Sequence, residues 1–313
     1  MKYLVTGGAG FIGSHLVDRL MVDGNMVTVL DDLSLGRREN IDQHKKNSNY
    51  KFVKKSITSK LDSLFKEGKF DAVFHLAALP RVQYSIAHPA ETHEANVNGT
   101  LNLLLAARDH GVKRFIASSS SSVYGDQKTM PLDESMEPKP ISPYALHKLV
   151  GEHYSRLFHL LYGMETVSLR YFNVYGPRQN PDGAYSGQIP KFFVKIMKGE
   201  VPVINGDGEQ TRDNTFVEDV INANVLASKT RNDMVFGQAF NIGGGQNTSV
   251  NKTTELILEL TKSSIKADHG PAVIEPKNTL ADTSKALKLL DWEPKTPYER
   301  GLEITYQYYK NRY

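Results

Sequence analysis

The sequence predicts an α/β fold: a doubly wound parallel sheet with a smaller, interleaved C-terminal domain. Two observations lead to this prediction. In the first half of the 313 residues, short apolar runs alternate with longer amphipathic stretches, as in repeated strand-helix-strand units. After Arg170 this pattern gives way to a region rich in glycine, proline and asparagine, residues 173–187, which indicates a change of domain.

The apolar runs expected to be buried strands are residues 2–6, 26–31, 50–54, 71–76, 112–118 and 165–170. The stretches long enough to be crossover helices are residues 11–22, 59–67, 91–110 and 143–162. A strand-like run at 214–217, a helix at 218–227 and a run at 239–242 could return to the sheet before a C-terminal helical region. We therefore expect residues 1–170 plus about 214–243 in the larger domain, and about 171–213 plus 244–313 in the smaller one.

Composition excludes several classes of protein. With 40% hydrophobic and 23% charged residues the chain has the balance of a globular protein, and a net charge of +3 with scattered basic residues argues against a nucleic-acid partner. The absence of cysteine excludes disulfides and thiolate chemistry, and the ten histidines show no ligand spacing, so no metal is expected. No apolar run suits a signal peptide or a membrane span, which predicts a cytoplasmic protein without membrane contact.

A glycine-rich segment lies directly between the first expected strand and the first expected helix. Gly7, Gly10 and Gly13 permit a tight turn, and the helix N-terminus then offers unpaired N–H groups to a pyrophosphate. Asp31 ends the second strand 18 residues after Gly13, where an acidic residue accepts hydrogen bonds from the adenosine ribose. Asp32 beside it repels a 2'-phosphate. The segment predicts NAD rather than NADP, although two arginines follow closely in the sequence.

Tyr144 and Lys148, four residues apart, stand at the start of the expected helix 143–162. Residues at this spacing share a helix face, so the lysine charge can stabilise a tyrosinate, whose ordinary pKa is about 10. Three other Tyr-Lys pairs have the same spacing, but only Tyr144 follows serines at a strand end, residues 118–122, where a parallel sheet binds its ligands. The structural alternatives are a surface pair for Tyr144 and Lys148, and strand-end capping for each serine.

Four motifs together carry a family resemblance that spans essentially the whole chain. They are Thr-Gly-Gly-Ala-Gly-Phe-Ile-Gly at 6–13, Ser-Ser-Ser-Ser-Ser-Val-Tyr-Gly at 118–125, Ser-Pro-Tyr at 142–144 with Lys148, and Tyr-Phe-Asn-Val-Tyr-Gly-Pro-Arg at 171–178. The chain resembles the nucleotide-sugar epimerases of the extended short-chain dehydrogenase/reductase family. The resemblance implies a Rossmann NAD-binding domain, a nucleotide-sugar-binding domain, and Ser120, Tyr144 and Lys148 as catalytic residues.

The resemblance also implies the binding residues. Those expected to contact NAD are Gly7, Gly10, Phe11, Ile12, Gly13, Asp31, Asp32, Ser34, Gly36, Ser56, Ile57, Leu76, Ala77, Ala78, Asn96, Tyr144, Lys148 and Tyr171. Those expected to contact the nucleotide sugar are Ser120, Tyr144, Asn173, Gln188, Ile189, Val203, Asn205, Arg212 and Thr279. The chain departs from the family at Ala272, which replaces a second diphosphate-binding arginine, and at Ser56, which replaces an aspartate near adenine.

The implied reaction is the reversible C4 epimerisation of a UDP-sugar through a 4-keto intermediate. Related dehydratases and decarboxylases carry acidic groups where this chain has Ser121 and Ser122, so oxidation and reduction alone are expected. Thr279 stands where a bulky tyrosine restricts the sugar site in relatives, and its small side chain permits an N-acetyl group without excluding plain hexoses. The stretch 177–185 resembles UDP-N-acetylglucosamine 4-epimerases.

The favoured substrates are therefore UDP-N-acetylglucosamine and UDP-N-acetylgalactosamine, or UDP-glucose and UDP-galactose. The alternatives are a UDP-glucuronate 4-epimerase, which shares a similar serine run, a reductase that releases NADH, and an NAD-binding regulatory protein without catalysis. By the same resemblance, apolar residues on the expected helices 91–110 and 143–162 could form the helical interface of a homodimer.

Overall fold

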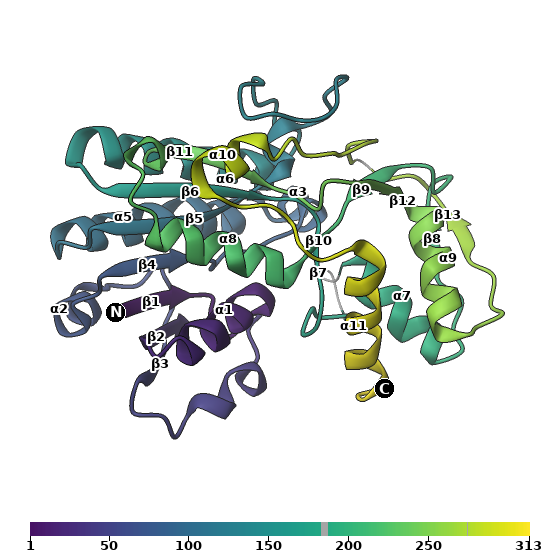
Figure 1. Ribbon diagram of the computed structural model, residues 1–313, viewed down its shortest axis with the longest axis horizontal. Helices are drawn as coiled ribbons and strands as arrows, with labels where there is room; N and C mark the ends of the chain where they lie inside the picture. Colours follow the sequence, from purple (N-terminus) through teal and green to yellow (C-terminus); the bar gives the residue numbers. More distant parts are fainter. Residues whose placement is uncertain (183–186, 274) are drawn as a thin grey trace.

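A computed structural model of the chain describes residues 1–182, 187–273 and 275–313. Its centre is a parallel sheet of seven strands in the order β11-β6-β5-β4-β1-β2-β3 (Figure 1). The strands are β1 (Lys2–Thr6), β2 (Met26–Asp31), β3 (Tyr50–Lys54), β4 (Ala72–His75), β5 (Arg114–Ser120), β6 (Glu165–Tyr171) and β11 (Gln238–Ile242). The strand order reverses between β1 and β4, and in such sheets this switch point is where a ligand crevice opens at the carboxyl ends of the strands.

Helices cover both faces of the sheet because side chains alternate along each strand. Tyr3 and Val5 of β1 pack in one apolar core with α1 (Phe11–Val22) and α8 (Val217–Lys229). Leu4, between them, packs in a second core on the opposite face. That core also contains apolar residues of α2 (Asp62–Gly68), α5 (Gly99–Asp109) and α6 (Pro143–Tyr162). This period of two with both faces buried produces the continuous apolar strands seen in the sequence.

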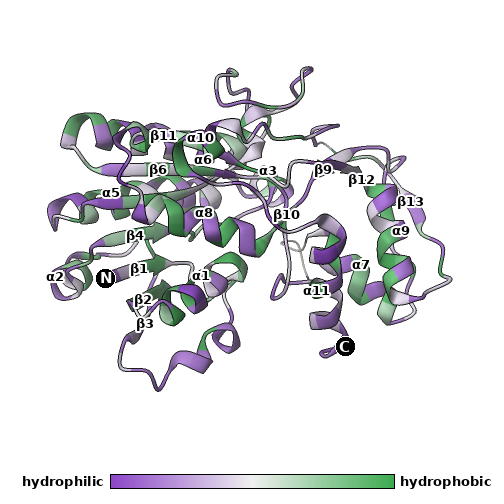
Figure 2. Ribbon diagram, in the orientation of Figure 1, coloured by the Kyte–Doolittle hydropathy of each residue, from purple (hydrophilic) through white to green (hydrophobic). Residues whose placement is uncertain are grey.

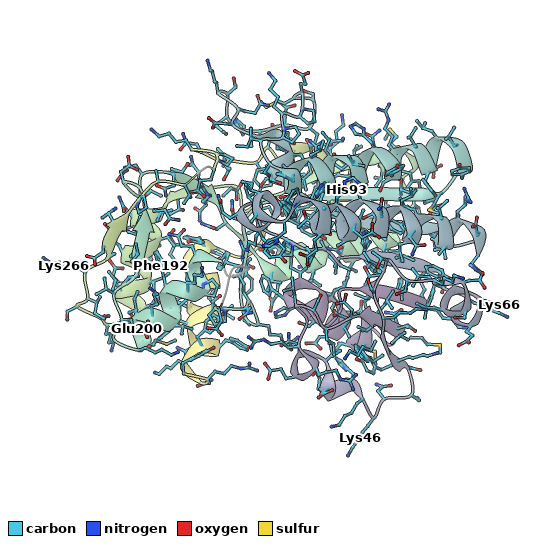
Figure 3. The ribbon with its side chains drawn as sticks, turned by 180° about the vertical axis from the view of Figure 1, so that it is seen from behind. Lys46, Lys66, His93, Phe192, Glu200 and Lys266 are labelled. Atoms are coloured by element: carbon cyan, nitrogen blue, oxygen red, sulfur yellow. The ribbon has the colours of Figure 1, made fainter. Side chains whose placement is uncertain are left out.

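A smaller lobe lies beside the sheet, at the right of Figure 1. Its helices are α7 (Gln188–Met197), α9 (Val250–Thr261) and α11 (Tyr298–Lys310), and its paired strands are β8 (Val203–Asn205) with β13 (Asp268–Gly270) and β9 (Thr211–Asp213) with β12 (Asn247–Ser249). Long parts of α7 and α9 are hydrophobic (Figure 2). Phe193 of α7 stacks on Tyr306 of α11 with ring centroids 5.9 Å apart, and Phe192 is buried in the same lobe (Figure 3).

The predicted fold class is confirmed, and the six predicted strands are present with ends shifted by at most two residues at either end. The run predicted at 239–242 does join the sheet, as β11 beside β6. The prediction of one helix at 91–110 was wrong in detail: α4 (Pro89–His93) leads through a π-helical turn at Glu94–Asn98 into α5. The division into two domains stays a prediction.

Several elements were not predicted from the sequence. They are α3 (Val82–Ala87), α7 and the short strands β7 (Val174–Tyr175), β8, β9, β12 and β13. These strands and α3 are too short for their periodicity to be visible in the sequence. The strand-like run predicted at 214–217 is present as β10 (Thr215–Phe216), but it pairs with β7 and does not join the central sheet. The helix α10 (Ser284–Leu290) belongs to the expected C-terminal helical region. None of the helices in the described ranges is long and apolar enough to span a bilayer.

Candidate active site

One cavity of about 830 Å³ extends from the glycine turn, past the carboxyl ends of the central strands, to the smaller lobe. All the predicted cofactor and substrate residues line it, with the exception of Asn96. Asn96 is buried, and its side-chain amide accepts from the Leu79 N–H at 2.7 Å and donates to the Leu79 carbonyl at 2.9 Å. In the structure, the Asn96 side chain therefore holds the segment that follows β4 through the Leu79 backbone.

The glycine turn is tight enough to require its glycines. Gly7 has a φ of +67°, and a Cβ atom at Gly13 would lie 2.1 Å from the Gly7 carbonyl oxygen. Gly10 is the N-cap of α1 and makes no side-chain capping bond, so the first turn of α1 directs its N–H groups into the cavity. A backbone cradle with these features suits a pyrophosphate.

Asp31, at the end of β2, lies beside this cradle. Its carboxylate accepts from the N–H groups of Ala9 and Leu33, each at 2.9 Å, and burial raises its pKa. Asp32 next to it accepts from the Ser34 N–H at 2.9 Å. Each Asp31 carboxylate oxygen accepts one of these bonds and retains a lone pair for a ribose hydroxyl, so the residues present fit an adenine dinucleotide.

The predicted catalytic side chains meet where β5 and α6 adjoin the cavity. Ser142 caps α6, accepting from the Ala145 N–H at 3.2 Å, with Pro143 in the first helical turn. This places Tyr144 in the cavity wall, where its hydroxyl shares a hydrogen bond with the Ser120 side chain. Lys148 Nζ donates to the Ser118 carbonyl at 2.9 Å and lies 6.0 Å from the centroid of the Tyr144 ring.

Burial and nearby charge act against each other at this pair. Burial raises the pKa of Tyr144, while the hydrogen bond from Ser120 and the positive charge of Arg81 lower it. Burial lowers the pKa of Lys148 to about 8, and the Glu152 carboxylate opposes that shift. Tyrosine can accept a proton only when cations stabilise its phenolate, so the arrangement is suited to acid/base chemistry at the Tyr144 hydroxyl.

A buried ion pair lies one helical turn beyond Lys148 on α6. Glu152, four residues after Lys148 on α6, accepts from Arg170 of β6 at 2.9 and 2.7 Å and from the Ser119 hydroxyl. These three side chains are buried. Glu152 therefore connects α6 to β6 through Arg170 and to β5 through Ser119, one helical turn beyond Lys148.

Three separate segments form the floor of the cavity on the side of the smaller lobe. Thr279 Oγ1 accepts from the Asp213 N–H at 3.1 Å and from the Asn173 amide at 3.3 Å. The Asp213 carboxylate accepts from the N–H groups of Gly244 and Ala281 at 2.5 and 2.9 Å, and burial raises its pKa to about 6. The predicted residues Asn173 and Thr279 are thus hydrogen-bonded to each other, and each also bonds to the backbone of Asp213.

Arg212 also lines the cavity. It forms an ion pair with Glu275 at 2.8 Å rather than with the neighbouring Asp213, and donates to the carbonyls of Thr211 and Lys277 at 2.8 and 3.2 Å. Its guanidinium is therefore already oriented by the protein. Residues 183–185 of the stretch 177–185, which carries the resemblance to UDP-N-acetylglucosamine 4-epimerases, lie outside the described residues.

Sequence reasoning assigned no individual role to four residues that shape the site: Ser118, Glu152, Arg81 and Glu275. Two of them carried a signal. Ser118 belongs to the serine run that we placed at the crevice, and Glu152 repeats the four-residue spacing of Tyr144 and Lys148. Arg81 and Glu275 lie in irregular segments without periodicity, and only the fold brings them to the cavity.

Three features define a dinucleotide-binding α/β protein with side chains placed for acid/base chemistry. They are the doubly wound sheet, the glycine cradle with an acid at the end of β2, and a tyrosine and lysine one helical turn apart beside a strand-end serine. The profile of the NAD dependent epimerase/dehydratase family matches residues 3–243. The chain belongs to this family, and NAD as cofactor is confirmed at that level. No cluster of three metal-binding side chains occurs in the described ranges.

Individual relatives match along their whole length. A UDP-glucose 4-epimerase of Mycolicibacterium smegmatis is 38% identical over 100% of this chain and 99% of its own. The crystal structure of the Thermotoga maritima UDP-glucose 4-epimerase with UDP-glucose superposes with a TM-score of 0.94 at 39% identity, covering 100% of this chain and 99% of that one. A UDP-N-acetylglucosamine 4-epimerase from Methanobrevibacter ruminantium, in complex with UDP-N-acetylmuramic acid, gives 0.93 at 38% identity with the same coverage.

Other members of the family perform related reactions. A UDP-glucuronate 4-epimerase from Thermodesulfobacterium geofontis is 36% identical, a UDP-glucuronic acid decarboxylase from Xenopus tropicalis 33%, and a dTDP-glucose 4,6-dehydratase from Streptomyces venezuelae 30%. The family relationship therefore establishes NAD-dependent chemistry on nucleotide sugars as the shared theme, and the site must indicate the particular reaction.

Proposed function

We propose that the protein catalyses the reversible C4 epimerisation of a UDP-sugar with NAD retained, and that UDP-N-acetylhexosamines or the plain hexoses are its substrates. The observation that carries this proposal is the set of charged side chains around Ser120, Tyr144 and Lys148. Among the described residues that line the cavity, the carboxylates are Asp31, Asp32 and Glu275. The first two lie at the glycine turn and Glu275 pairs with Arg212, which leaves serines, and no acid, beside Tyr144.

The residues then have the following roles. Tyr144 as phenolate takes the proton of the sugar 4-hydroxyl, Ser120 donates a hydrogen bond to the same oxygen, and Lys148 stabilises the phenolate. When bound in the glycine cradle, NAD supplies the hydride acceptor and donor at C4. After the keto sugar turns in the cavity, Tyr144 returns its proton to the new 4-hydroxyl, so no net oxidation results. Without a carboxylic acid at hand, loss of water or of carbon dioxide is not assisted.

The part of the cavity next to the smaller lobe offers groups that suit a UDP-sugar. Arg212 offers a fixed cation for the diphosphate, and the first turn of α7, with Gln188 and Ile189, adds backbone N–H groups. Ala272, near Gly206, supplies no second cation. Beside the sugar, Thr279 is small and held by its bonds to Asp213 and Asn173.

The experiment is to incubate the purified protein separately with UDP-N-acetylglucosamine, UDP-glucose and UDP-glucuronate and to follow the C4 epimer by proton NMR. We expect N-acetylglucosamine or glucose to convert fastest. Preferential conversion of UDP-glucuronate would replace the proposed substrate by the runner-up. If NAD is bound and none of the three is converted, a catalytically silent NAD-binding protein becomes the better account.

Replacing Thr279 by tyrosine tests the choice of sugar. A tyrosine would fill the space beside the sugar and remove the hydroxyl bonded to Asp213 and Asn173. We expect kcat/KM for UDP-N-acetylglucosamine, relative to UDP-glucose, to fall roughly 10- to 100-fold, the usual cost of crowding a fitted pocket. Thr279→Ser, which keeps the hydroxyl, is the matched control. An unchanged ratio in Thr279→Tyr would remove Thr279 from the specificity argument.

The pKa of Lys148 predicts an alkaline limit to activity. Because burial lowers this pKa to about 8, Lys148 is charged below that pH and loses its charge as the pH rises through it. The phenolate of Tyr144 then loses a stabilising partner, so kcat should decline on the alkaline side. The measurement is kcat against pH at saturating substrate. Glu152→Gln should move the decline to lower pH, since the carboxylate raises the pKa of Lys148; a rate that is flat throughout the alkaline range contradicts this role.

We also propose a homodimer formed through α6. Leu157, Leu160 and Leu161 are 46%, 63% and 67% exposed on this helix, an apolar strip of the kind that mediates association. Sedimentation of the purified protein measures its mass directly. A monomer at micromolar concentration would count against the dimer, while leaving the proposed reaction untouched because all the site residues come from one chain.

A further inference from the structure

Arg81 has an unusual backbone conformation next to the proposed catalytic tyrosine. It is the N-cap of α3 with φ of +90° and ψ of 124°, a region that residues with a Cβ rarely occupy. Such conformations persist only where the surroundings hold them, and they concentrate at functional sites. Arg81 also lines the cavity and is partly buried. An arginine kept in this state requires an explanation.

Two contacts hold the segment around Arg81. Before it, Asn96 bonds both backbone groups of Leu79. After it, the Ser85 hydroxyl accepts from the Tyr144 N–H at 3.0 Å and donates to the Val82 carbonyl at 2.7 Å, which joins the first turn of α3 to the first turn of α6. The distance between Arg81 and Tyr144 is therefore set by the fold and does not depend on a flexible loop.

Arg81 and Tyr144 line the same cavity. The Arg81 guanidinium packs against Gly187, because a Cβ at Gly187 would come within 3.4 Å of Arg81 Nη2. Its charge acts on two neighbours: it lowers the pKa of Tyr144 and contributes to lowering that of Lys191 in α7. The surroundings of Tyr144 thus contain more positive charge than Lys148 alone provides.

We propose that Arg81 is a positioning residue that acts through Tyr144, as a second cation that stabilises its phenolate together with Lys148. The proposal rests on the proposed role of Tyr144 as acid/base. The two cations differ in a way that makes both useful: a guanidinium keeps its charge at every physiological pH, whereas the pKa of Lys148 is lowered to about 8 and its ammonium is bonded to Ser118.

The test compares Arg81→Met and Arg81→Gln, which remove the charge, with Arg81→Lys, which keeps it. Arg156→Met, an exposed arginine on α6, controls for the loss of one positive charge. The first readout is the acidic limb of kcat against pH, since the rate rises as Tyr144 ionises. The second, which needs no turnover, is tyrosinate ultraviolet absorbance during pH titration of the NAD-bound protein, with Tyr144→Phe subtracted.

We expect the neutral variants to move both midpoints to higher pH by about one unit, the size of the effect of a nearby charge, while Arg81→Lys and Arg156→Met stay close to wild type. Lower kcat at every pH with unmoved midpoints in whichever neutral variant folds would overturn the proposal. The two levels can be separated: full activity of Tyr144→Phe refutes the proposed function itself, whereas an inactive Tyr144→Phe with unmoved midpoints in the Arg81 variants refutes only Arg81.

Discussion

Tyr144→Phe is expected to lower kcat by about 10²- to 10⁴-fold, the usual contribution of a general acid/base. Phenylalanine retains the ring that packs in the cavity wall and removes only the hydroxyl that bonds to Ser120. KM should therefore change little, and the variant should bind NAD as the wild type does. The measurement is the initial rate of C4 epimer formation by NMR, with bound NAD quantified after denaturation.

Tyr124→Phe is the matched control for this prediction. The Tyr124 hydroxyl is buried and donates to the Asn241 side chain at 2.7 Å, away from the cavity lining. Its loss costs the free energy of one buried hydrogen bond, about 1 kcal/mol of stability, and should leave kcat near wild type. If Tyr144→Phe keeps wild-type kcat, proton transfer takes place elsewhere and the assignment of Tyr144 fails.

Gly13→Ala is expected to abolish most NAD binding. The added Cβ would lie 2.1 Å from the Gly7 carbonyl oxygen and 2.8 Å from Gly8 Cα, and both are backbone atoms that cannot rotate away. The turn must open, at a cost of about 1–3 kcal/mol. The N–H groups of the cradle are then displaced, so NAD affinity should fall about tenfold or more. Calorimetric titration of the cofactor-free protein with NAD measures the loss.

Gly151→Ala serves as the control because it is also a glycine-to-alanine change within a helix. The nearest atom to its added Cβ is Thr100 Cγ2 at 3.8 Å, an ordinary contact. Here alanine should raise the free energy of unfolding by about 0.5–1 kcal/mol through its higher helix propensity and leave NAD affinity unchanged. Equal NAD affinity in Gly13→Ala and Gly151→Ala would show that the cofactor does not use this turn.

The sheet could be predicted from the sequence because each of its buried strands forms an apolar run that is recognisable without its neighbours. Runs such as 2–6 and 26–31 are apolar throughout, since helices cover both faces, and the observed strands coincide with them. The smaller lobe was harder to predict from the sequence than the sheet. Its strands β8 and β13 have three residues each and pair across a long separation in sequence. Neither an alternating apolar pattern nor a turn motif in the sequence therefore predicts them.

For the candidate site, spacing and context together were informative. The glycine turn, Asp31, Tyr144 and Lys148 could be selected because each stands at a defined end of a strand or helix. The floor of the cavity could not be derived in this way, because Asn173, Asp213 and Thr279 come from segments joined only in the folded chain. The resemblance supplied Asn173 and Thr279, and neither route indicated that both bond to the backbone of Asp213.

The measurement that tests the central account most directly uses UDP-N-acetylglucosamine, or the plain hexose if that converts faster, labelled with deuterium at C4. We predict that the epimer formed retains the deuterium at C4, with no NADH accumulating in solution, because hydride leaves and returns within one cavity that also holds the Tyr144 proton. Loss of the label to the solvent, or release of NADH in step with turnover, would contradict it.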